Sequence, residues 1–397
     1  MAEAAKEEAK WAKEGAITDE ALEKLRQKIG MKLRPIEWWG YNHQASTDTI
    51  SHFADGVGDP NPLWRDEEYA GKTSYKGIVA PPSFLLTVFV PAYWLGLSGV
   101  HAFHSGSDYE FYKPIYPGDK LHTELKFIGF DEKTTDFAPK WIIQYFECPY
   151  YDQQDELVAK AIGSIVRAER SGMKAKGKYT KIQYPHPWTE DEVKKIEEEV
   201  LDEQIRGSKT RYWEDVKEGE EIPQLVKGPL GITDVISWMM GGNTMMLPAH
   251  SVALRFYKNN PGMTLWHPGT HTNEIIETVH WDTVASATSG LPYPYYYGAQ
   301  GQSWLIQSIT HWMGDDGWLK KTKSEYRKFV YLSDVVRIKG KVVKKYVDED
   351  GEHCIDIESS AMNQREENIM PTYSTVALPS REKNHWPVQR RLPGKQQ

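Results

Sequence analysis

The segment GIVAPPSFLLTVFVPAYWLGLSGV (residues 77–100) contains no Asp, Glu, Lys or Arg, and it decides how the chain must fold. A stretch of 24 residues is long enough to cross a bilayer as a helix. It also contains three prolines, and it lacks the flanking aromatic and basic residues that anchor a spanning helix on both sides. A turn-rich start followed by one helix buried inside protein is the better interpretation.

A second uncharged stretch covers residues 283–314, and the landmarks around the two stretches repeat. TDTIS (47–51) resembles TDVIS (233–237) at an offset of 186 residues. EFYKPIYPGD (110–119) resembles EYRKFVYLSD (325–334) at an offset of 215 residues, so the second copy has a net insertion of 29 residues. This self-similarity indicates two copies of one domain.

Both copies become strand-like after the uncharged stretch, because apolar and polar residues alternate there. The alternating segments are residues 120–130, 141–151 and 157–169 in the first copy and 335–346, 353–364 and 372–379 in the second. A helix that is apolar on every side needs partners on every side, and a curved antiparallel sheet supplies them. The sequence therefore predicts an α+β chain of two fused hot-dog domains, each an antiparallel sheet wrapped around a central helix.

The repeat also divides the chain into segments. Thr18 is a plausible cap for an N-terminal helix with Leu22, Leu25 and Ile29 on one face, and Thr189 with Glu192 forms a capping box for a surface helix. The expected segments are a helical arm (1–33), a first domain (34–170), a linker with one helix (171–209), a second domain (210–380) with an insertion at about 243–279, and a tail (381–397).

Composition limits the class of protein. The chain has 397 residues, 40% of them hydrophobic and 12% aromatic, which is enough to build packed cores. Its net charge of −8 argues against a nucleic-acid partner, since such binding usually requires a basic face. The only cysteines, Cys148 and Cys354, exclude a disulfide scaffold, and the charged N-terminus has no apolar core of a signal peptide. We expect a cytoplasmic protein with no membrane partner.

The segment GDPNPLWRDEEYA (58–70) is either a catalytic motif or only a turn. Gly, Asp, Asn and Pro are the residues that turns select for backbone reasons alone. Together with YKGIVAPPSF (75–84), this segment resembles the N-terminal domain of the MaoC-like, two-domain acyl-thioester dehydratases and (R)-specific enoyl-CoA hydratases. VHWDTVASATSGLP (279–292) and YYYGAQ (295–300) resemble the partner domain of the same family.

The resemblance implies a double hot-dog fold and a thioester substrate carried on coenzyme A or a related pantetheine, and we expect no separate cofactor. In the family, an Asp followed five residues later by a His forms the catalytic pair, and here that pair is split. Asp59 and Asn61 match the motif in the first copy, but Trp64 stands where the His belongs. In the second copy His280 and Asp282 match, while Ile275 stands five residues before the histidine.

The chemistry favours the second copy. Hydration of an enoyl thioester needs a base for water, a proton for the α-carbon and fixed donors for the thioester oxygen. Backbone N–H groups at the start of the central helix can be those donors, and Gly298 is the candidate. In the first copy, Ala80 precedes Pro81 and Pro82, which have no N–H to give.

The predicted catalytic residues are therefore His280, with Glu277 or Glu274 as its acidic partner, and Asp59 if the two half-sites approach each other. The predicted substrate-binding residues are Gly298, Asn61, Trp64, Asp282 and Tyr297.

Three other groups of residues have two possible roles each. His250, His267, His271 and Glu274 suggest zinc, but Pro268 and Gly269 indicate a loop, and we expect no metal. Tyr293, Tyr295, Tyr296, Tyr297 and Trp304 either line an acyl pocket or fill the core. His101 and His104 either touch a ligand or have a structural role.

The sequence thus predicts a hydro-lyase that adds or removes water at the 2,3-position of an acyl-CoA, working as a homodimer or higher homo-oligomer. Two alternatives stay open. A thioesterase on the same fold would direct a carboxylate-activated water at the carbonyl carbon. A partner subunit whose catalytic pairs have both decayed would work only beside a catalytic chain.

Overall fold

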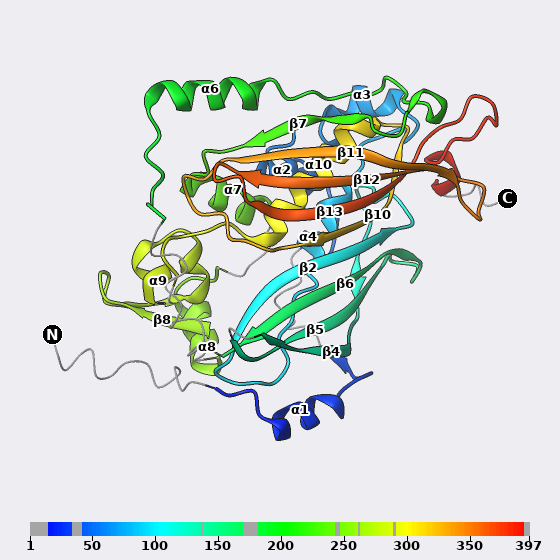
Figure 1. Cartoon of the computed structure of the whole chain (residues 1–397). Coiled ribbons are helices and arrows are strands. Elements are labelled where there is room, and N and C mark those ends of the chain that lie inside the picture. Colours follow the sequence, from blue (N-terminus) through cyan, green and yellow to red (C-terminus); the bar gives the residue numbers. More distant parts are fainter. Residues whose placement is uncertain are drawn as a thin grey trace.

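One continuous antiparallel sheet of eleven strands carries both halves of the chain (Figure 1). The structure is a computed structural model, and it describes residues 15–33, 42–135, 138–169, 182–242, 247–260, 263–288 and 291–392. The strand order is β1-β4-β5-β6-β2-β10-β13-β12-β11-β7, with β3 paired to β5 outside this path. The two halves join where β2 pairs with β10, and Glu110 there lies opposite Lys321.

The strands confirm the alternating segments predicted from sequence. The first half contributes β1 (Lys32–Leu33), β2 (His101–Phe111), β3 (His122–Thr123), β4 (Leu125–Thr135), β5 (Ala138–Tyr151) and β6 (Leu157–Ala168). The second half contributes β7 (Glu221–Lys227), β10 (Trp318–Glu325), β11 (Val336–Val347), β12 (His353–Asn363) and β13 (Asn368–Ala377).

The two TD-x-I-S repeats begin equivalent helices, α2 (Thr47–Val57) and α7 (Ile232–Gly242), which pack against each other. Glycines allow this close crossing. A Cβ at Gly56 would lie 2.6 Å from the Ser237 carbonyl oxygen, and one at Gly241 would lie 2.2 Å from the His52 carbonyl oxygen. The crossing therefore ties the two copies together through their own repeated element.

The central helix predicted for the second half is present. Helix α10 (Gly298–Met313) has buried residues over its whole length, and the concave side of the second half's sheet wraps it (Figure 1). A short helix, α9 (Thr283–Thr288), precedes it within the same uncharged stretch.

The single buried helix predicted for residues 77–100 is wrong. Only η2 (Pro82–Phe84) and α4 (Leu85–Val88) are helical, and the backbone leaves helical geometry at Phe89. Pro91 cannot donate the helical hydrogen bond and disfavours helical geometry at the residue before it. Its carbonyl also fills the space above Gly163, where a Cβ would lie 1.5 Å from the Pro91 oxygen.

Arg167 replaces the hydrogen bonds that a helix would have made. Its side chain is only 2% exposed, and its guanidinium donates to the backbone carbonyls of Leu95, Gly96, Leu97, Val100 and His101. Burial lowers the pKa of this guanidinium to about 10, so it stays charged at neutral pH. One cation therefore holds the non-helical segment in place.

The arm and the linker follow their predicted caps. Thr18 caps α1 (Asp19–Arg26), and Leu22 and Leu25 of this helix are buried. Ile29 lies beyond the helix and is 49% exposed, so its predicted place on the same face is wrong. Thr189 and Glu192 form the capping box of α6 (Glu190–Leu201) as predicted. Residues 1–14 and 170–181 lie outside the described residues.

The insertion forms a lobe at one end of the sheet (Figure 1). Its elements are α8 (His250–Asn259), β8 (Thr264–His267), β9 (Thr272–Ile275) and η5 (Ile276–His280). The remaining short helices are η1 (Pro62–Trp64), α3 (Glu67–Lys72), η3 (Trp213–Asp215) and η6 (Gln389–Arg391).

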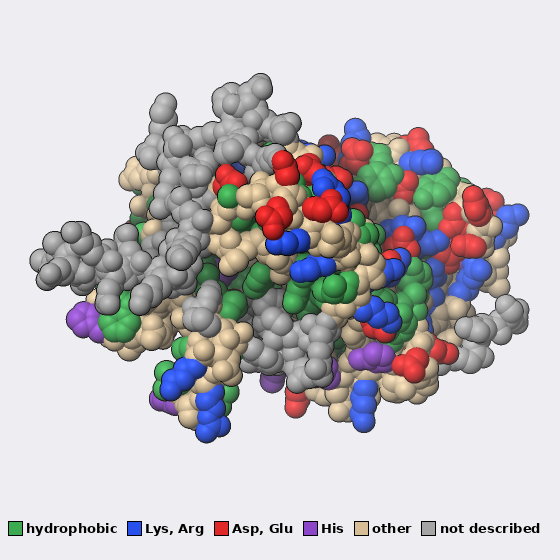
Figure 2. All heavy atoms as spheres, turned by 90° about the horizontal axis from the view of Figure 1, so that it is seen from below, with side chains coloured by type: hydrophobic (Ala, Val, Ile, Leu, Met, Phe, Trp, Pro, Cys, Tyr) green, Lys and Arg blue, Asp and Glu red, His purple; other side chains and the backbone are tan. Residues whose placement is uncertain are grey.

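The surface carries both signs of charge. Acidic and basic side chains are interspersed on the face seen in Figure 2 and do not gather into one basic patch there. None of the helices in the described part of the chain is both long and apolar enough to span a membrane.

Candidate active site

The main candidate site is a cavity of about 450 Å³ where the two halves meet. The first half lines it with the non-helical segment after α4 and with residues 102–105 of β2. The second half lines it with residues 295–299 at the start of α10 and with residues 326–329 after β10. Its wall is mostly aromatic and apolar, as is typical of small-molecule pockets.

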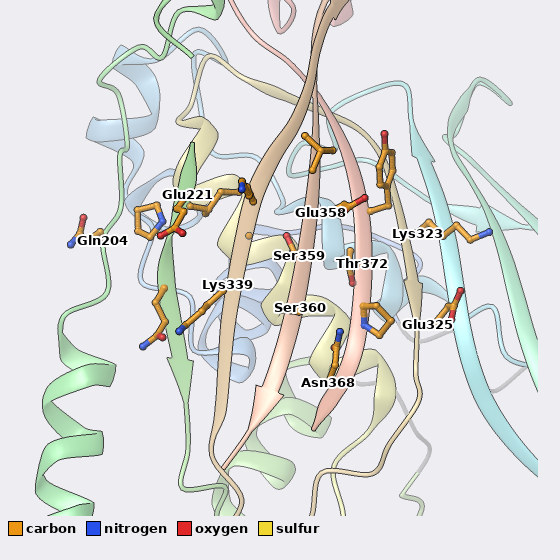
Figure 3. Close-up of a pocket in the computed structure, with 18 residues that line it drawn as sticks. Gln204, Glu221, Lys323, Glu325, Lys339, Glu358, Ser359, Ser360, Asn368 and Thr372 are labelled. Atoms are coloured by element: carbon orange, nitrogen blue, oxygen red, sulfur yellow. The ribbon is translucent and has the colours of Figure 1, made fainter. Parts of the chain in front are cut away.

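A larger hollow of about 950 Å³ lies on the other face of the sheet, across β7, β11, β12 and β13. Figure 3 shows Lys339, Glu358 and Lys323 projecting over it, with Ser359 and Thr372 between them and the central helix behind the strands. This hollow is open and charged, and none of the residues predicted as catalytic or substrate-binding lines it. We therefore take the cavity between the halves as the candidate site.

His280 is buried at the end of η5 and lines this cavity. Its Nδ1 lies 2.7 Å from the Tyr295 carbonyl oxygen, and its ring stacks on Tyr297 at 3.7 Å between centroids. A carbonyl only accepts hydrogen bonds, so Nδ1 carries the hydrogen and Nε2 keeps its lone pair. Burial lowers the pKa of His280 to about 4, so the imidazole is neutral at neutral pH.

Gly298 is the first residue of α10 and lines the same cavity, as does Ala299. The first N–H groups of a helix have no acceptor within the helix, and the helix dipole favours negative charge beside them. Only glycine fits here, because a Cβ would lie 2.5 Å from the ring of Tyr326. The structure thus brings together His280, Gly298 and Tyr297 of the predicted residues.

Asp59, Asn61 and Trp64 lie elsewhere. The Asp59 carboxylate accepts hydrogen bonds from the Asn61 backbone N–H at 3.0 Å and from Trp64 Nε1 at 2.9 Å. Asn61 in turn accepts the Leu63 N–H and caps η1. None of these three residues lines the cavity of His280.

The unexpected partner of Asp59 is His311, near the end of α10. His311 Nε2 lies 2.9 Å from Asp59 Oδ1, and its Nδ1 lies 3.3 Å from Glu203. A helical rise of about 1.5 Å per residue places His311 about 20 Å from Gly298. Asp59 and the His280 cavity therefore lie towards opposite ends of the central helix.

This second cluster is buried, and the hollows beside it are small. Burial opposes ionisation of Asp59, but the hydrogen bond and charge of His311 outweigh it and hold the pKa below its ordinary value. Lys227 and Gln307 both donate to the Gly58 carbonyl, and Gln307 also donates to Glu203. The hollow beside His311 is about 10 Å³, and the one that Asn61 and Trp64 line is about 40 Å³. Sequence reasoning missed His311 because no spacing relates it to Asp59.

Glu277 and Asp282 flank His280 in sequence but do not line the cavity. Burial raises the pKa of Glu277 to about 7, and its Oε2 has no hydrogen-bond partner among the described residues. Asp282 Oδ1 accepts the Ala285 N–H at 2.8 Å and lies 3.1 Å from His267 Nε2. Asp282 thus holds the start of α9 to the insertion.

The aromatic residues near His280 were expected either to line the pocket or to fill the core, and each interpretation holds for some of them. Tyr295, Tyr296 and Tyr297 line the cavity, whereas Trp304 is buried and stacks on Tyr296 at 5.7 Å. His104 lines the cavity as well.

The contacts of His267 agree with the predicted loop at Pro268 and Gly269. The backbone N–H groups of Gly269 and Thr270 donate to His267 Nδ1, as in a tight turn. Within the described residues, no three His, Cys, Asp or Glu side chains are grouped so that they could hold a metal ion.

Residues 40–161 match the family model described as "FAS1-like, dehydratase domain region". A UPF0336 protein from Streptomyces avermitilis is 30% identical over 86 residues, which cover 20% of this chain and 57% of that protein. A UPF0336 protein from Parafrankia sp. is 34% identical over 87 residues, which cover 20% of this chain and 56% of that protein. The chain thus spans little more than half the length of these relatives.

Solved structures share the fold of the whole chain. A MaoC-like dehydratase has a TM-score of 0.59 at 16% identity, with 89% of this chain and 99% of that chain covered. A conserved hypothetical protein from Mycobacterium tuberculosis, described as a double hot-dog fold, has a TM-score of 0.50 at 11% identity, with 88% and 96% covered. The predicted α+β fold of two fused hot-dog domains and the resemblance to MaoC-like dehydratases are confirmed.

Proposed function

We propose that this chain, a double hot-dog protein with the fold of the MaoC-like dehydratases, is a hydro-lyase that adds or removes water at the 2,3-position of an acyl-CoA thioester. One observation carries the proposal. His280 and the N-terminus of α10 at Gly298 line the same apolar cavity between the halves. A base and an oxyanion donor are the two groups that this reaction needs closest to the substrate.

The proposed roles follow from the geometry. In hydration, the water oxygen bonds to C3, and the C2=C3 electron pair moves towards the thioester oxygen. His280 Nε2 takes the proton that water loses, and the Gly298 N–H stabilises the charge on oxygen. The imidazolium then returns that proton to C2, so one water has been added and the base is regenerated.

The cavity wall supports an acyl thioester as the ligand. Its aromatic lining suits a bulky or ring-containing acyl group. Arg327 and Lys328 are cations among its lining residues, and each also pairs with a carboxylate, Glu325 and Glu367 respectively. These cations suit the phosphates of coenzyme A. We further propose that the protein needs no separate cofactor and works as a cytoplasmic homo-oligomer.

The test is hydration of a panel of trans-2-enoyl-CoA thioesters by the purified protein. Replacing a general acid-base group lowers the rate by about 10²–10⁴. We expect this loss for His280→Asn, because an Asn amide can still donate to the Tyr295 carbonyl but has nothing in place of Nε2. An unchanged rate for His280→Asn would contradict the assignment. The Asp59→Asn variant tests separately whether Asp59 takes part in catalysis.

The incomplete motif favours one further candidate function. Neither half of the chain holds both members of the Asp-His pair, since Trp64 and Ile275 stand in the missing positions. A partner subunit of a larger dehydratase would therefore be inactive alone. Hydration by the purified chain excludes that role, and release of free thiol without hydration would identify a thioesterase instead.

A further inference from the structure

His104 enters the cavity from the first half of the molecule, on the strand that joins the two halves. The pairing of β2 with β6 shifts register between His104 and Gly106, which marks a β-bulge. Bulges re-aim side chains, and they are frequent beside active sites. Gly106 is required at this point, because a Cβ there would lie 2.5 Å from the Ser324 carbonyl oxygen.

The hydrogen bonds of His104 fix which nitrogen is available. Its Nε2 lies 3.1 Å from the Gly106 carbonyl oxygen and 2.8 Å from Ser107 Oγ. Since the carbonyl can only accept, Nε2 carries the hydrogen and Nδ1 keeps its lone pair. His104 therefore presents an acceptor nitrogen, as His280 does from the second half.

Each imidazole packs against an aromatic ring next to Gly298. His280 stacks on Tyr297, the residue directly before Gly298. His104 packs edge-on against Tyr326 at 4.7 Å, and the same Tyr326 ring lies against Gly298. A thioester oxygen bound at the Gly298 N–H would thus have one imidazole beside Tyr297 and the other beside Tyr326.

We propose that His104 is a second catalytic residue, which holds the reacting water together with His280. The inference rests on the proposed hydration of an acyl thioester. His104 would take the water-holding role that a carboxylate has in the Asp-His pair. No carboxylate fills that role here, because Ile275 stands at the acid position of the second copy and Asp59 is bound to His311.

The proposed step uses both hydrogens of one water molecule. One hydrogen donates to His104 Nδ1, which orients the oxygen towards C3. The other passes to His280 Nε2 as the C3–O bond forms and the π electrons move to the thioester oxygen. His280 then gives this proton to C2, so His104 gains and loses no proton over the cycle.

Two substitutions of His104 separate catalysis from structure. In His104→Gln, the amide nitrogen can take the place of Nε2 and still donate to the Gly106 carbonyl, but no acceptor remains at the Nδ1 position. In His104→Asn, an amide oxygen can lie near the Nδ1 position, but the bond to Gly106 is lost. His101→Gln is the matched control, since His101 lies on the same strand and does not line the cavity.

We expect kcat for enoyl-CoA hydration to fall about 10²-fold in His104→Gln, with KM changed little, and to be partly retained in His104→Asn. His101→Gln should keep the wild-type rate. The reverse order, with Gln active and Asn inactive, would show a structural role and overturn the inference while the proposed function stands. A wild-type protein that hydrates no member of the panel would overturn the proposed function, and this inference with it.

Discussion

At the scale of single residues, the two parts of the predicted catalytic motif lie in separate places. Trp64 donates its indole N–H to Asp59 from the position where a histidine was expected, and His311 supplies an imidazole from the other half. His280 keeps its place in the second copy and faces the cavity. The sequence indicated Asp59, Trp64 and His280 as parts of the motif, but not His311. It could not indicate that Asp59 and His280 lie apart, because no local pattern reports the distance between them.

Gly298 gives the first prediction at this scale. A Cβ in Gly298→Ala would meet the Tyr326 ring and shift the helix start, so the N–H would leave its position. Loss of one oxyanion donor costs about 10²–10³ in kcat. Steady-state hydration kinetics measure this effect. Gly71→Ala is the matched control, because a Cβ there meets nothing within 4 Å, and it should keep the wild-type kcat.

Asp59 gives a second prediction, on stability and pH. Its native pKa lies below the value of about 3.9 for an unfolded Asp, so its stabilising effect is present at neutral pH and is lost as pH falls through the native pKa. Asp59→Asn should lower the free energy of unfolding by about 3–5 kcal/mol at pH 7, because the partner charges stay buried. This difference should shrink below about pH 4.

Urea unfolding of wild type and variant across this pH range measures the difference. Asp55→Asn serves as the control, because Asp55 pairs with Arg65 on the surface, and it should change stability by less than about 1 kcal/mol. A constant Asp59→Asn effect down to pH 3 would contradict the proposed ion pair.

At the scale of elements, strands were predicted better than helices. Alternation of apolar and polar residues located the strands because one face of the sheet packs on the core. The prediction of a helix over residues 77–100 was wrong, because a stretch without charged residues indicates burial but does not indicate secondary structure. Arg167 shows how the chain resolves the conflict, since its side chain satisfies the carbonyls that no helix satisfies.

Arg167 carries the prediction at this scale. Arg167→Met would leave several buried carbonyls without donors, at about 1–3 kcal/mol for each one that water cannot reach. We expect a large drop in Tm, and Arg167→Lys should rescue little of it, because an ammonium cannot fork across several carbonyls at once. Thermal unfolding followed by circular dichroism decides this. A Tm within 2 °C of wild type in both variants would be evidence against the role of Arg167.

At the scale of the whole molecule, the two halves form one sheet and share one cavity. The repeat in the sequence identified the duplication, and it also placed Gly298 at the start of the central helix. It could not show that β2 pairs with β10, or that His104 and His280 line one space. Those facts depend on contacts between residues far apart in the chain, which leave no periodic signal.

The glycine crossing of α2 and α7 provides the prediction at this scale. Gly241→Ala would place a Cβ 2.2 Å from the His52 carbonyl oxygen and force the two helices apart. Overpacking of this kind costs about 1–3 kcal/mol. Because the helices come from different halves, we expect one cooperative transition at lower urea concentration. Two separate transitions would indicate that the halves unfold independently.

The central claim is that water adds at C3 of an acyl-CoA in the cavity between the halves. The most direct measurement is product analysis by mass spectrometry after incubation of wild type and His280→Asn with an enoyl-CoA in heavy-oxygen water. The account predicts heavy oxygen in the 3-hydroxyl group of an intact thioester with wild type, and almost none with the variant. Heavy oxygen in a free carboxylate, or equal labelling by both proteins, would contradict it.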